Sequence, residues 1–148
     1  MPPHDLSSED QSYVKLYLLL PLILSAFERD KKIAERVFKT PRPYINMMES
    51  AMRKVDADLK EVRKRFRELG LKVYEEQRKD DFIVAKYLCR GYHYDMTLNV
   101  KLVVAESSVL MEKYLGLDIM QYINTSVPGG KEKYDVPSDK LFDKVKQQ

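Results

Sequence analysis

The sequence predicts an α+β fold that is mainly helical, with a three-helix bundle-like core and one β-hairpin inserted between the second and third long helices. Apolar residues recur at helical spacing up to Leu69, the period changes to two after Gly70, and helical spacing returns before Leu115. A chain of 148 residues is long enough to bury one core. We therefore expect a single domain over residues 1–124, followed by a C-terminal tail over residues 125–148 that is mobile or docks.

The first helix is expected to begin in the stretch 7–10, where Ser-Ser-Glu-Asp offers capping hydroxyls followed by acids that suit the positive end of a helix. The stretch 13–27 is apolar nearly all round, which is typical of a central core helix. It contains Lys15 and Pro21 and is shorter than the roughly 20 residues that span a bilayer, so we expect no membrane partner. We also expect Pro21 to bend or interrupt the helix before a separate amphipathic stretch at 33–38.

An uninterrupted heptad stripe predicts the second helix, from about Tyr44 to Leu69. Its apolar residues alternate steps of three and four and therefore share one seam: Ile45, Met48, Met52, Val55, Leu59, Val62, Phe66 and Leu69. Gly70 stands where a left-handed cap would end the helix. The seam lacks the regular leucines of a dimeric zipper, so we favour packing within the chain over packing against a second copy. The apolar first helix nevertheless leaves enough hydrophobic surface for us to expect a homodimer.

The change of period after Gly70 predicts the hairpin, over about residues 71–89. Alternating side chains at 71–76 indicate one strand, residues 77–81 a polar loop, and 82–89 a second strand rich in strand-forming residues. Gly91 is expected to end the second strand.

A third helix is expected to start at a cap on Asp95 or Thr97 and to end at Gly116. Its apolar face would carry Leu98, Leu102, Ala105, Val109, Leu110 and Tyr114. A shorter helical piece is expected over residues 117–123.

Positive charge is concentrated around the second helix. Residues 28–79 hold 16 Lys and Arg against 10 Asp and Glu, whereas residues 80–148 hold 9 against 10. If the helix broke at 56–58, a basic helix at 59–69 followed by a hairpin would resemble the element order of a winged helix-turn-helix. The residues that would then contact nucleic acid are Arg53, Lys60, Arg63, Lys64, Arg67, Arg78 and Lys79.

Two observations favour a solvated helix face over a nucleic-acid surface. The heptad runs through 56–58 without a change of phase, which favours an unbroken helix. Acidic residues are interleaved with the basic ones, at spacings that permit ion pairs of Lys54 with Asp58 and of Lys64 with Glu68.

The densest group of polar and aromatic residues lies at 87–95. Rings that stack on a ligand and a guanidinium that pairs with an anion would form a ligand or peptide pocket from Tyr87, Arg90, Tyr92, His93 and Tyr94. A simpler interpretation, which we favour, is that the tyrosines are strand formers and that Arg90 pairs with a carboxylate of the same chain.

The sequence carries no catalytic, metal or cofactor signature. Cys89 is the only cysteine, and although His93 follows four residues later, the two match no known arrangement of nucleophile and base. With Asp95 they would make only three metal ligands, one fewer than a structural zinc site takes. We expect no cofactor and no metal, and a single cysteine fits a reducing, cytoplasmic location.

These observations predict a small cytosolic, non-enzymatic regulatory or adaptor protein that acts by macromolecular interaction as a homodimer. Its partners would be a second copy and another protein. The alternative is a winged-helix-like DNA-binding transcriptional regulator that uses the basic helix 59–69 and the hairpin 71–89.

Overall fold

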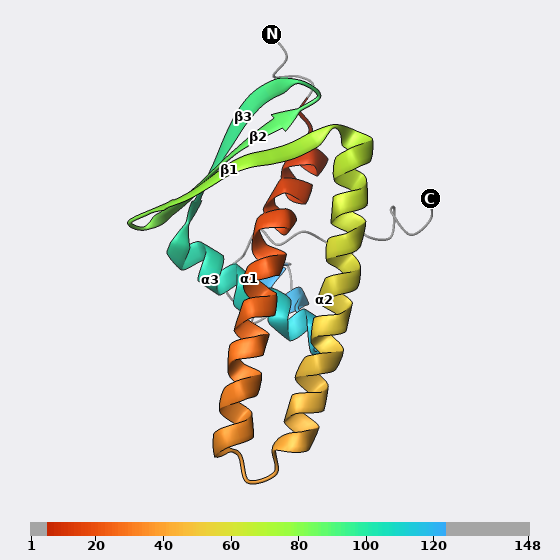
Figure 1. Cartoon of the computed structure of the whole chain (residues 1–148), viewed down its shortest axis with the longest axis vertical. Helices are drawn as coiled ribbons and strands as arrows, with labels where there is room; N and C mark the ends of the chain where they lie inside the picture. Colours follow the sequence, from red (N-terminus) through yellow and green to blue (C-terminus); the bar gives the residue numbers. More distant parts are fainter. Residues whose placement is uncertain (1–5, 124–148) are drawn as a thin grey trace. The chain divides into compact units, whose positions relative to one another are not determined.

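A computed structural model describes residues 6–123, in which two long helices precede a sheet and two further helices (Figure 1). The helices are α1 (Ser8–Val37), α2 (Pro41–Leu69), α3 (Val100–Tyr114) and α4 (Met120–Ile123). The strands are β1 (Leu71–Lys79), β2 (Phe82–Cys89) and β3 (Tyr92–Asn99), and they form one antiparallel sheet in the order β1-β2-β3. The predicted α+β class, mainly helical, is confirmed.

The described residues form two compact units. Unit 1 contains the chain up to Leu18 together with Leu59–Val104, and unit 2 contains Leu19–Asp58 together with the described residues from Ala105 onward. The long helices α1 and α2 therefore each contribute one part to unit 1 and the other part to unit 2. The single domain expected over 1–124 stays a prediction, and the tail predicted over 125–148 lies outside the described residues.

Helix α1 begins with the predicted cap. The Ser7 Oγ accepts a hydrogen bond from the Asp10 N–H at 3.0 Å, and the Asp10 carboxylate accepts one from the Ser7 N–H at 3.0 Å, which is a reciprocal capping box. The helix then continues through Pro21 to Val37, so the predicted interruption and the separate stretch at 33–38 are wrong. Pro21 is exposed, where water can satisfy the carbonyl that its missing N–H leaves unpaired.

The expected core helix is confirmed for the apolar part of α1. Its fully buried apolar residues have exposed fractions of 0 or 1%, and they are Tyr13, Val14, Leu16, Leu19, Leu20, Ile23 and Phe27. Each turn of this stretch therefore contributes apolar side chains to the interior.

Helix α2 is a single helix, as the heptad predicts. It passes through Asp56 and Asp58 without a break, so the separate helix at 59–69 that a winged helix-turn-helix requires is not formed. The middle of the seam is buried within the one chain, at Val55, Leu59, Val62 and Phe66, while Ile45, Met48, Met52 and Leu69 are half-buried. Gly70 ends the helix at a φ of +69°, as expected.

The sheet has a third strand, β3, that was not predicted from the sequence. Gly91 lies just after the end of β2, as expected, but Arg90 (φ +49°) and Gly91 (φ +87°) form a tight turn that leads into β3 and not into a helix. Positive φ at both central residues is the type I′ geometry of hairpins. The polar loop expected at 77–81 is also shorter, since β1 extends to Lys79 and only Asp80 and Asp81 connect it to β2.

A β-bulge disturbs the alternation predicted for β1. The register shifts between Val73, opposite Tyr87, and Glu75, opposite Lys86, so that Tyr74 is the extra residue. Glu75 therefore faces the side opposite to Val73, rather than the same side.

Helix α3 starts later than predicted, while Val109, Leu110 and Tyr114 of its expected apolar face are buried as predicted. The Asn99 Oδ1 caps it by accepting hydrogen bonds from the N–H groups of Lys101 at 2.9 Å and Leu102 at 3.3 Å. Leu102, assigned to the apolar face, is 46% exposed, whereas Val103 and Glu106 are buried. The predicted end is confirmed, because Gly116 (φ +94°) closes a Schellman motif.

Candidate functional site

The five residues of the pocket predicted at 87–95 do not form one site. Tyr87 is 1% exposed and stacks on Tyr94 with ring centroids 5.8 Å apart, and burial raises the pKa of Tyr87 to about 12. Its hydroxyl therefore stays protonated at neutral pH. Tyr92 is 46% exposed at the start of β3. The Arg90 guanidinium binds the carboxylate of Asp10 in the same chain.

Two of the predicted pocket residues, His93 and Tyr94, do line an open depression of about 460 Å³ in unit 1. Its other lining residues, Tyr74, Lys86 and Asp95, were not predicted, because they come together only through the pairing of β1 and β2 with the unpredicted strand β3. The Tyr74 hydroxyl lies 3.0 Å from the His93 Nδ1, and the Lys86 Nζ lies 3.4 Å from a carboxylate oxygen of Glu75. The polar groups are thus largely engaged with one another.

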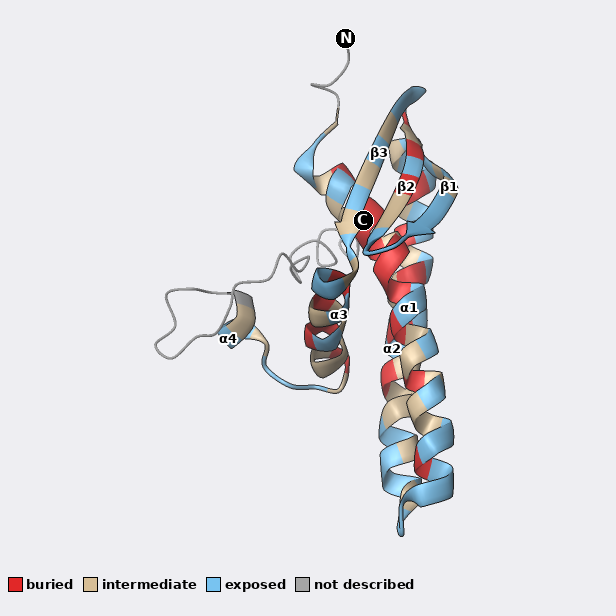
Figure 2. Cartoon of the chain, turned by 90° about the vertical axis from the view of Figure 1, so that its left-hand side faces the viewer, coloured by how far each residue is buried: buried red, intermediate tan, exposed pale blue. Residues whose placement is uncertain are grey.

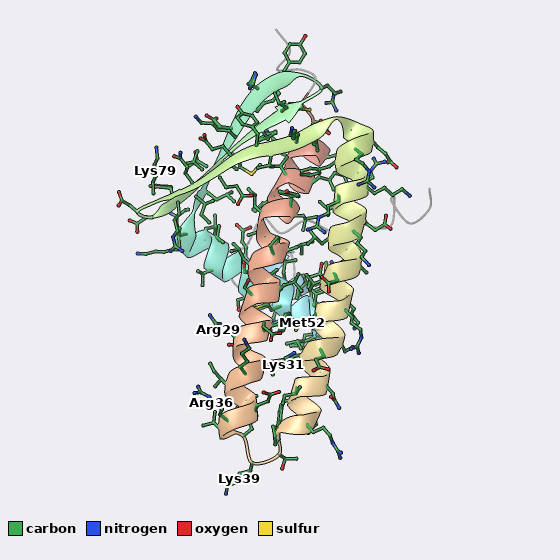
Figure 3. All side chains as sticks on the ribbon, in the orientation of Figure 1. Arg29, Lys31, Arg36, Lys39, Met52 and Lys79 are labelled. Atoms are coloured by element: carbon green, nitrogen blue, oxygen red, sulfur yellow. The ribbon has the colours of Figure 1, made fainter. Side chains whose placement is uncertain are left out.

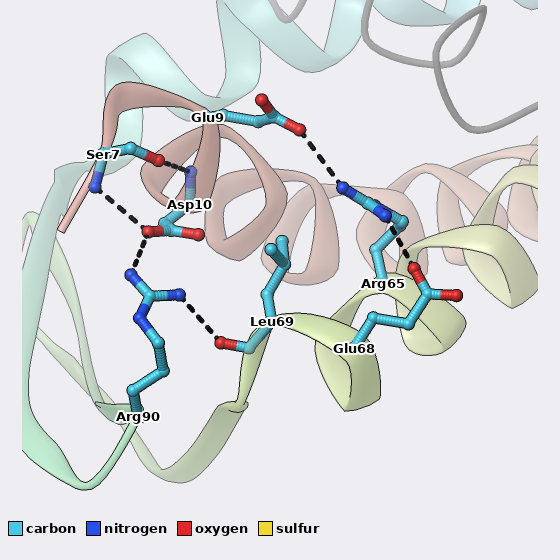
Figure 4. A network of polar contacts seen from close by, with 7 residues as sticks. All are labelled: Ser7, Glu9, Asp10, Arg65, Glu68, Leu69 and Arg90. Carbon is cyan, nitrogen blue, oxygen red and sulfur yellow. Dashed lines mark hydrogen bonds and ion pairs between the residues drawn. The ribbon is translucent and has the colours of Figure 1, made fainter. Parts of the chain in front are cut away.

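The favoured interpretation of Arg90, an ion pair within the chain, is confirmed. Its Nη2 donates to the Asp10 Oδ2 at 2.7 Å, its Nη1 donates to the Leu69 carbonyl at 2.9 Å, and its N–H donates to the Gly70 carbonyl at 2.8 Å (Figure 4). The guanidinium therefore joins the start of α1, the end of α2 and the turn between β2 and β3 within unit 1. This is a structural role.

A second ion-pair group in unit 1 surrounds Arg65. Its guanidinium lies 2.6 Å from Glu68 and 3.4 Å from Glu9 (Figure 4). It also sits over the Tyr13 ring, 5.7 Å from the centroid. Burial on its own lowers the pKa of Arg65, but the interactions with Glu68 and Tyr13 together outweigh it, and the net pKa is raised. Glu68 therefore pairs with Arg65, and the predicted pair with Lys64 is wrong.

Cys89 and His93 lie on opposite faces of the sheet. Cys89 is buried, with its Sγ 3.8 Å from the Asp10 Oδ2, whereas His93 is exposed and pairs across the sheet with Leu88. Between residues 6 and 123, no three His, Cys, Asp or Glu side chains come together as a metal site would require. Among the helices in that range, none has the length and apolar character needed to cross a bilayer.

The residues predicted to contact nucleic acid are all exposed, but they do not form one surface within a single unit. Arg53 belongs to unit 2, while unit 1 contains four on α2 and two at the end of β1, namely Lys60, Arg63, Lys64, Arg67, Arg78 and Lys79. The predicted ion pair of Lys54 with Asp58 is also wrong, because Asp58 accepts a hydrogen bond from the Tyr114 hydroxyl at 2.7 Å.

Unit 2 contains an open groove of about 400 Å³ with a mostly apolar lining, which we call the apolar groove. Its lining comes from α1, the connection after it, α2 and the end of α3, and comprises Phe27, Asp30, Ile33, Phe38, Tyr44, Met47, Met48, Met111 and Leu115. Asp30 is the one charged side chain in that set, and the Tyr44 hydroxyl is the other polar group. Its carboxylate accepts a hydrogen bond from the Arg29 Nε at 3.0 Å.

Several residues of the apolar groove are unusually exposed for large apolar side chains. Ile33 is 41% exposed, Phe38 45%, Tyr44 48% and Met47 46%. Phe38 and Tyr44 pack edge to face with centroids 5.1 Å apart, which fixes the wall formed where α1 meets α2. This groove could not be predicted from the sequence, because its residues come from three separate stretches of the chain. One of them, 33–38, was expected to lie outside the first helix.

Comparison with known proteins places the chain in a family. Residues 5–119 match the family described as YhjD protein. The chain is also 28% identical to a protein of Bacillus subtilis (strain 168) named "Uncharacterized protein YhjD", over 89 residues that make up 60% of this chain and 74% of the Bacillus protein. No solved structure matches it. Because the family match extends over more than half of its length, this chain belongs to the YhjD protein family.

Proposed function

We propose that this protein is a non-enzymatic adaptor or regulatory protein that binds an amphipathic helix of a partner protein in the apolar groove. The observation that supports this proposal is the open groove itself, which leaves large apolar side chains such as Phe38 and Met47 nearly half exposed. Apolar surface of this kind, gathered in one concave place, typically marks a site of interaction.

The composition of the groove favours a helix over a small molecule. Three of the lining residues are methionines, Met47, Met48 and Met111, whose flexible side chains adapt to the differing shapes of partner side chains. Small-molecule sites usually add several convergent polar groups that fix the orientation of the ligand, and here only the Asp30 carboxylate and the Tyr44 hydroxyl are polar. Laying an apolar helix face into a groove needs no such groups.

Fluorescence anisotropy with a labelled synthetic peptide tests this proposal. The probe is an 18-residue amphipathic helix with a leucine face and glutamine elsewhere, so that it carries no charge. We expect the full chain to bind it and the double variant Ile33→Glu, Met47→Glu to bind at least about tenfold more weakly, because each substitution puts a charge into an apolar contact. Both positions are more than 40% exposed, so the fold should tolerate the change.

The matched control is Tyr92→Glu, which places the same charge at a 46% exposed aromatic residue of unit 1. It should bind the peptide as the unmodified chain does. If the peptide does not bind the unmodified chain, or if Tyr92→Glu loses binding to the same extent as the double variant, the proposal is wrong.

Self-association and a cytoplasmic location are further parts of this proposal. A second copy of the chain would supply the helix in a homodimer, and the molar mass measured by light scattering over a range of concentrations reports it directly. If the groove mediates this dimer, Ile33→Glu, Met47→Glu should shift the mass toward that of a monomer.

A second candidate function is DNA binding by unit 1. The observation that favours it is that Lys60, Arg63, Lys64 and Arg67 are exposed on α2 and make no ion pair with any residue that the structure describes. Such cations are free to contact phosphates.

A further inference from the structure

We infer that the helix bound by the apolar groove is acidic where it meets the end of unit 2 at which α1 is joined to α2. This inference rests on the proposed function and adds the charge of the partner. We call residues 32–42, which include the last turns of α1 and the start of α2, the hairpin end.

The hairpin end carries cations that no acid among residues 6–123 pairs with. It contains four basic residues, Lys32, Arg36, Lys39 and Arg42, against one acid, Glu35. All four basic residues are exposed, and none of them forms an ion pair with a residue in the described part of the chain. Figure 3 shows Arg36 and Lys39 projecting outward from this end.

Two other cations of the same unit, Lys31 and Arg29, are paired with acids. The Lys31 Nζ lies 3.3 Å from Glu28 and 3.6 Å from Glu49, and Figure 3 shows Lys31 between the two helices. The hydrogen bonds and charge of Glu28 and Glu49 outweigh burial and raise the pKa of Lys31. Arg29 is likewise paired with Asp30. The acids Glu28, Asp30 and Glu49 are therefore engaged by these two cations, whereas the four cations of the hairpin end have no ion-pair partner in the described part of the chain.

The start of α2 adds to the positive potential. The N-terminal end of a helix carries a partial positive charge, and proteins usually place acids there, as this chain does with Glu9 and Asp10 in α1. The first turn of α2 contains no acid and instead contains Arg42. A positive side chain at the positive end of a helix is locally unfavourable, and an acidic partner would relieve it.

The cations and the groove share the same end of the unit. Phe38 and Tyr44 line the groove, Lys39 follows Phe38 directly, and Arg42 lies two residues before Tyr44. Figure 2 shows exposed residues clustered where α1 and α2 are joined. A helix that places its apolar face against Phe38 and Tyr44 would bring flanking carboxylates within reach of these cations.

An anionic membrane offers the same charge, but the geometry favours a helix. Asp30 is part of the groove lining. Docking of the groove on an anionic lipid surface would bring the Asp30 carboxylate close to lipid phosphates, and these like charges would repel each other. The groove is also concave, which suits a helix ridge more than a flat bilayer. Binding to anionic vesicles is therefore measured beside peptide binding.

The experiment compares three labelled peptides with the same leucine face and with Glu, Gln or Lys on the flanking positions, matched for helicity by circular dichroism. We expect the full chain to bind the Glu peptide about tenfold more tightly than the Lys peptide at low salt, and we expect the difference to shrink in 0.5 M NaCl. The triple variant Arg36→Gln, Lys39→Gln, Arg42→Gln should lose this preference and still bind the Gln peptide normally. The control Arg63→Gln, Lys64→Gln, Arg67→Gln removes the same charge from unit 1 and should keep the preference.

The outcomes separate this inference from the proposed function. Equal binding of all three peptides would overturn the inference and leave the groove proposal standing, whereas binding of none would overturn both. Co-sedimentation with phosphatidylglycerol vesicles is the remaining arm. Vesicle binding that the triple variant abolishes, without any peptide binding, would assign the surface to a membrane and overturn the inference; absence of vesicle binding alongside the peptide preference would support it.

Discussion

Asp10 illustrates how a buried charge is kept ionised in this molecule. The residue is 2% exposed, and burial on its own raises the pKa of its carboxyl. Hydrogen bonds from the Arg90 guanidinium and from Ser7 outweigh burial, so the net pKa is lowered. A carboxyl with a lowered folded-state pKa stabilises the fold above its unfolded pKa of about 3.9, and this contribution is lost as the pH falls through the folded pKa.

We therefore predict that Arg90→Gln costs about 1 to 3 kcal/mol of unfolding free energy at pH 7, because it leaves the Asp10 carboxylate without its cation. The Arg90 side chain is 39% exposed, and solvent screening keeps the cost below that of a fully buried pair. Urea titrations at several pH values measure it. The deficit should shrink below about pH 4, where Asp10 protonates in the unfolded chain.

Asp10→Asn serves as the background that identifies the pair. In that background Arg90→Gln should cost less than in the unmodified chain, since the charge interaction is already gone. An equal cost in both backgrounds, or a deficit that does not depend on pH, would show that the Arg90 side chain acts through its hydrogen bond to the Leu69 carbonyl alone.

At the scale of secondary structure, helix α2 shows which features the sequence determines. Its seam has an unbroken three-and-four spacing, and the central residues Val55, Leu59 and Val62 are buried as that spacing predicts. Local sequence rules for helix ends and strand ends gave the wrong expectation at two residues, Pro21 and Arg90. Pro21 lies within α1 because it is exposed, so that water can replace the hydrogen bond that proline cannot donate. Strand β3 forms because Arg90 adopts a left-handed φ, which is not expected of a residue other than glycine, asparagine or aspartate.

The seam makes a direct prediction about stability. Leu59 is 4% exposed, so Leu59→Ala should cost about 2 to 5 kcal/mol and Leu59→Asp should prevent folding, because it buries an unpaired charge. Ala57→Asp, an exposed position on the same helix, should cost less than about 1 kcal/mol. Thermal unfolding followed by circular dichroism compares the three. Near-native stability of Leu59→Asp would mean that the seam is not part of the core.

At the scale of the whole molecule, the interaction surfaces were much less predictable than the elements. The stretch 87–95 looked like a pocket because it is rich in tyrosine, yet its residues alternate across a sheet and Tyr87 faces inward. The apolar groove depends on α1 continuing past Phe27, which places Ile33 and Phe38 beside residues of α2 and α3. Sequence periodicity does not reveal that continuation, because Pro21 and the charges at 28–32 resemble a helix end.

The last prediction separates DNA binding from protein interaction across the molecule. Arg63→Gln, Lys64→Gln, Arg67→Gln should fold normally, because all three side chains are exposed on α2 and outside any described ion pair. Only if α2 binds DNA should the unmodified chain also shift duplex DNA in a gel, with log affinity falling linearly against log salt and with the variant reducing that slope by about 3. The triple variant at Arg36, Lys39 and Arg42 removes equal charge from the hairpin end. If this second variant weakens DNA binding as much as the first, the binding reflects net charge and not a specific surface on α2. If the unmodified chain gives no gel shift at low salt, the cations of α2 contact solvent and not DNA.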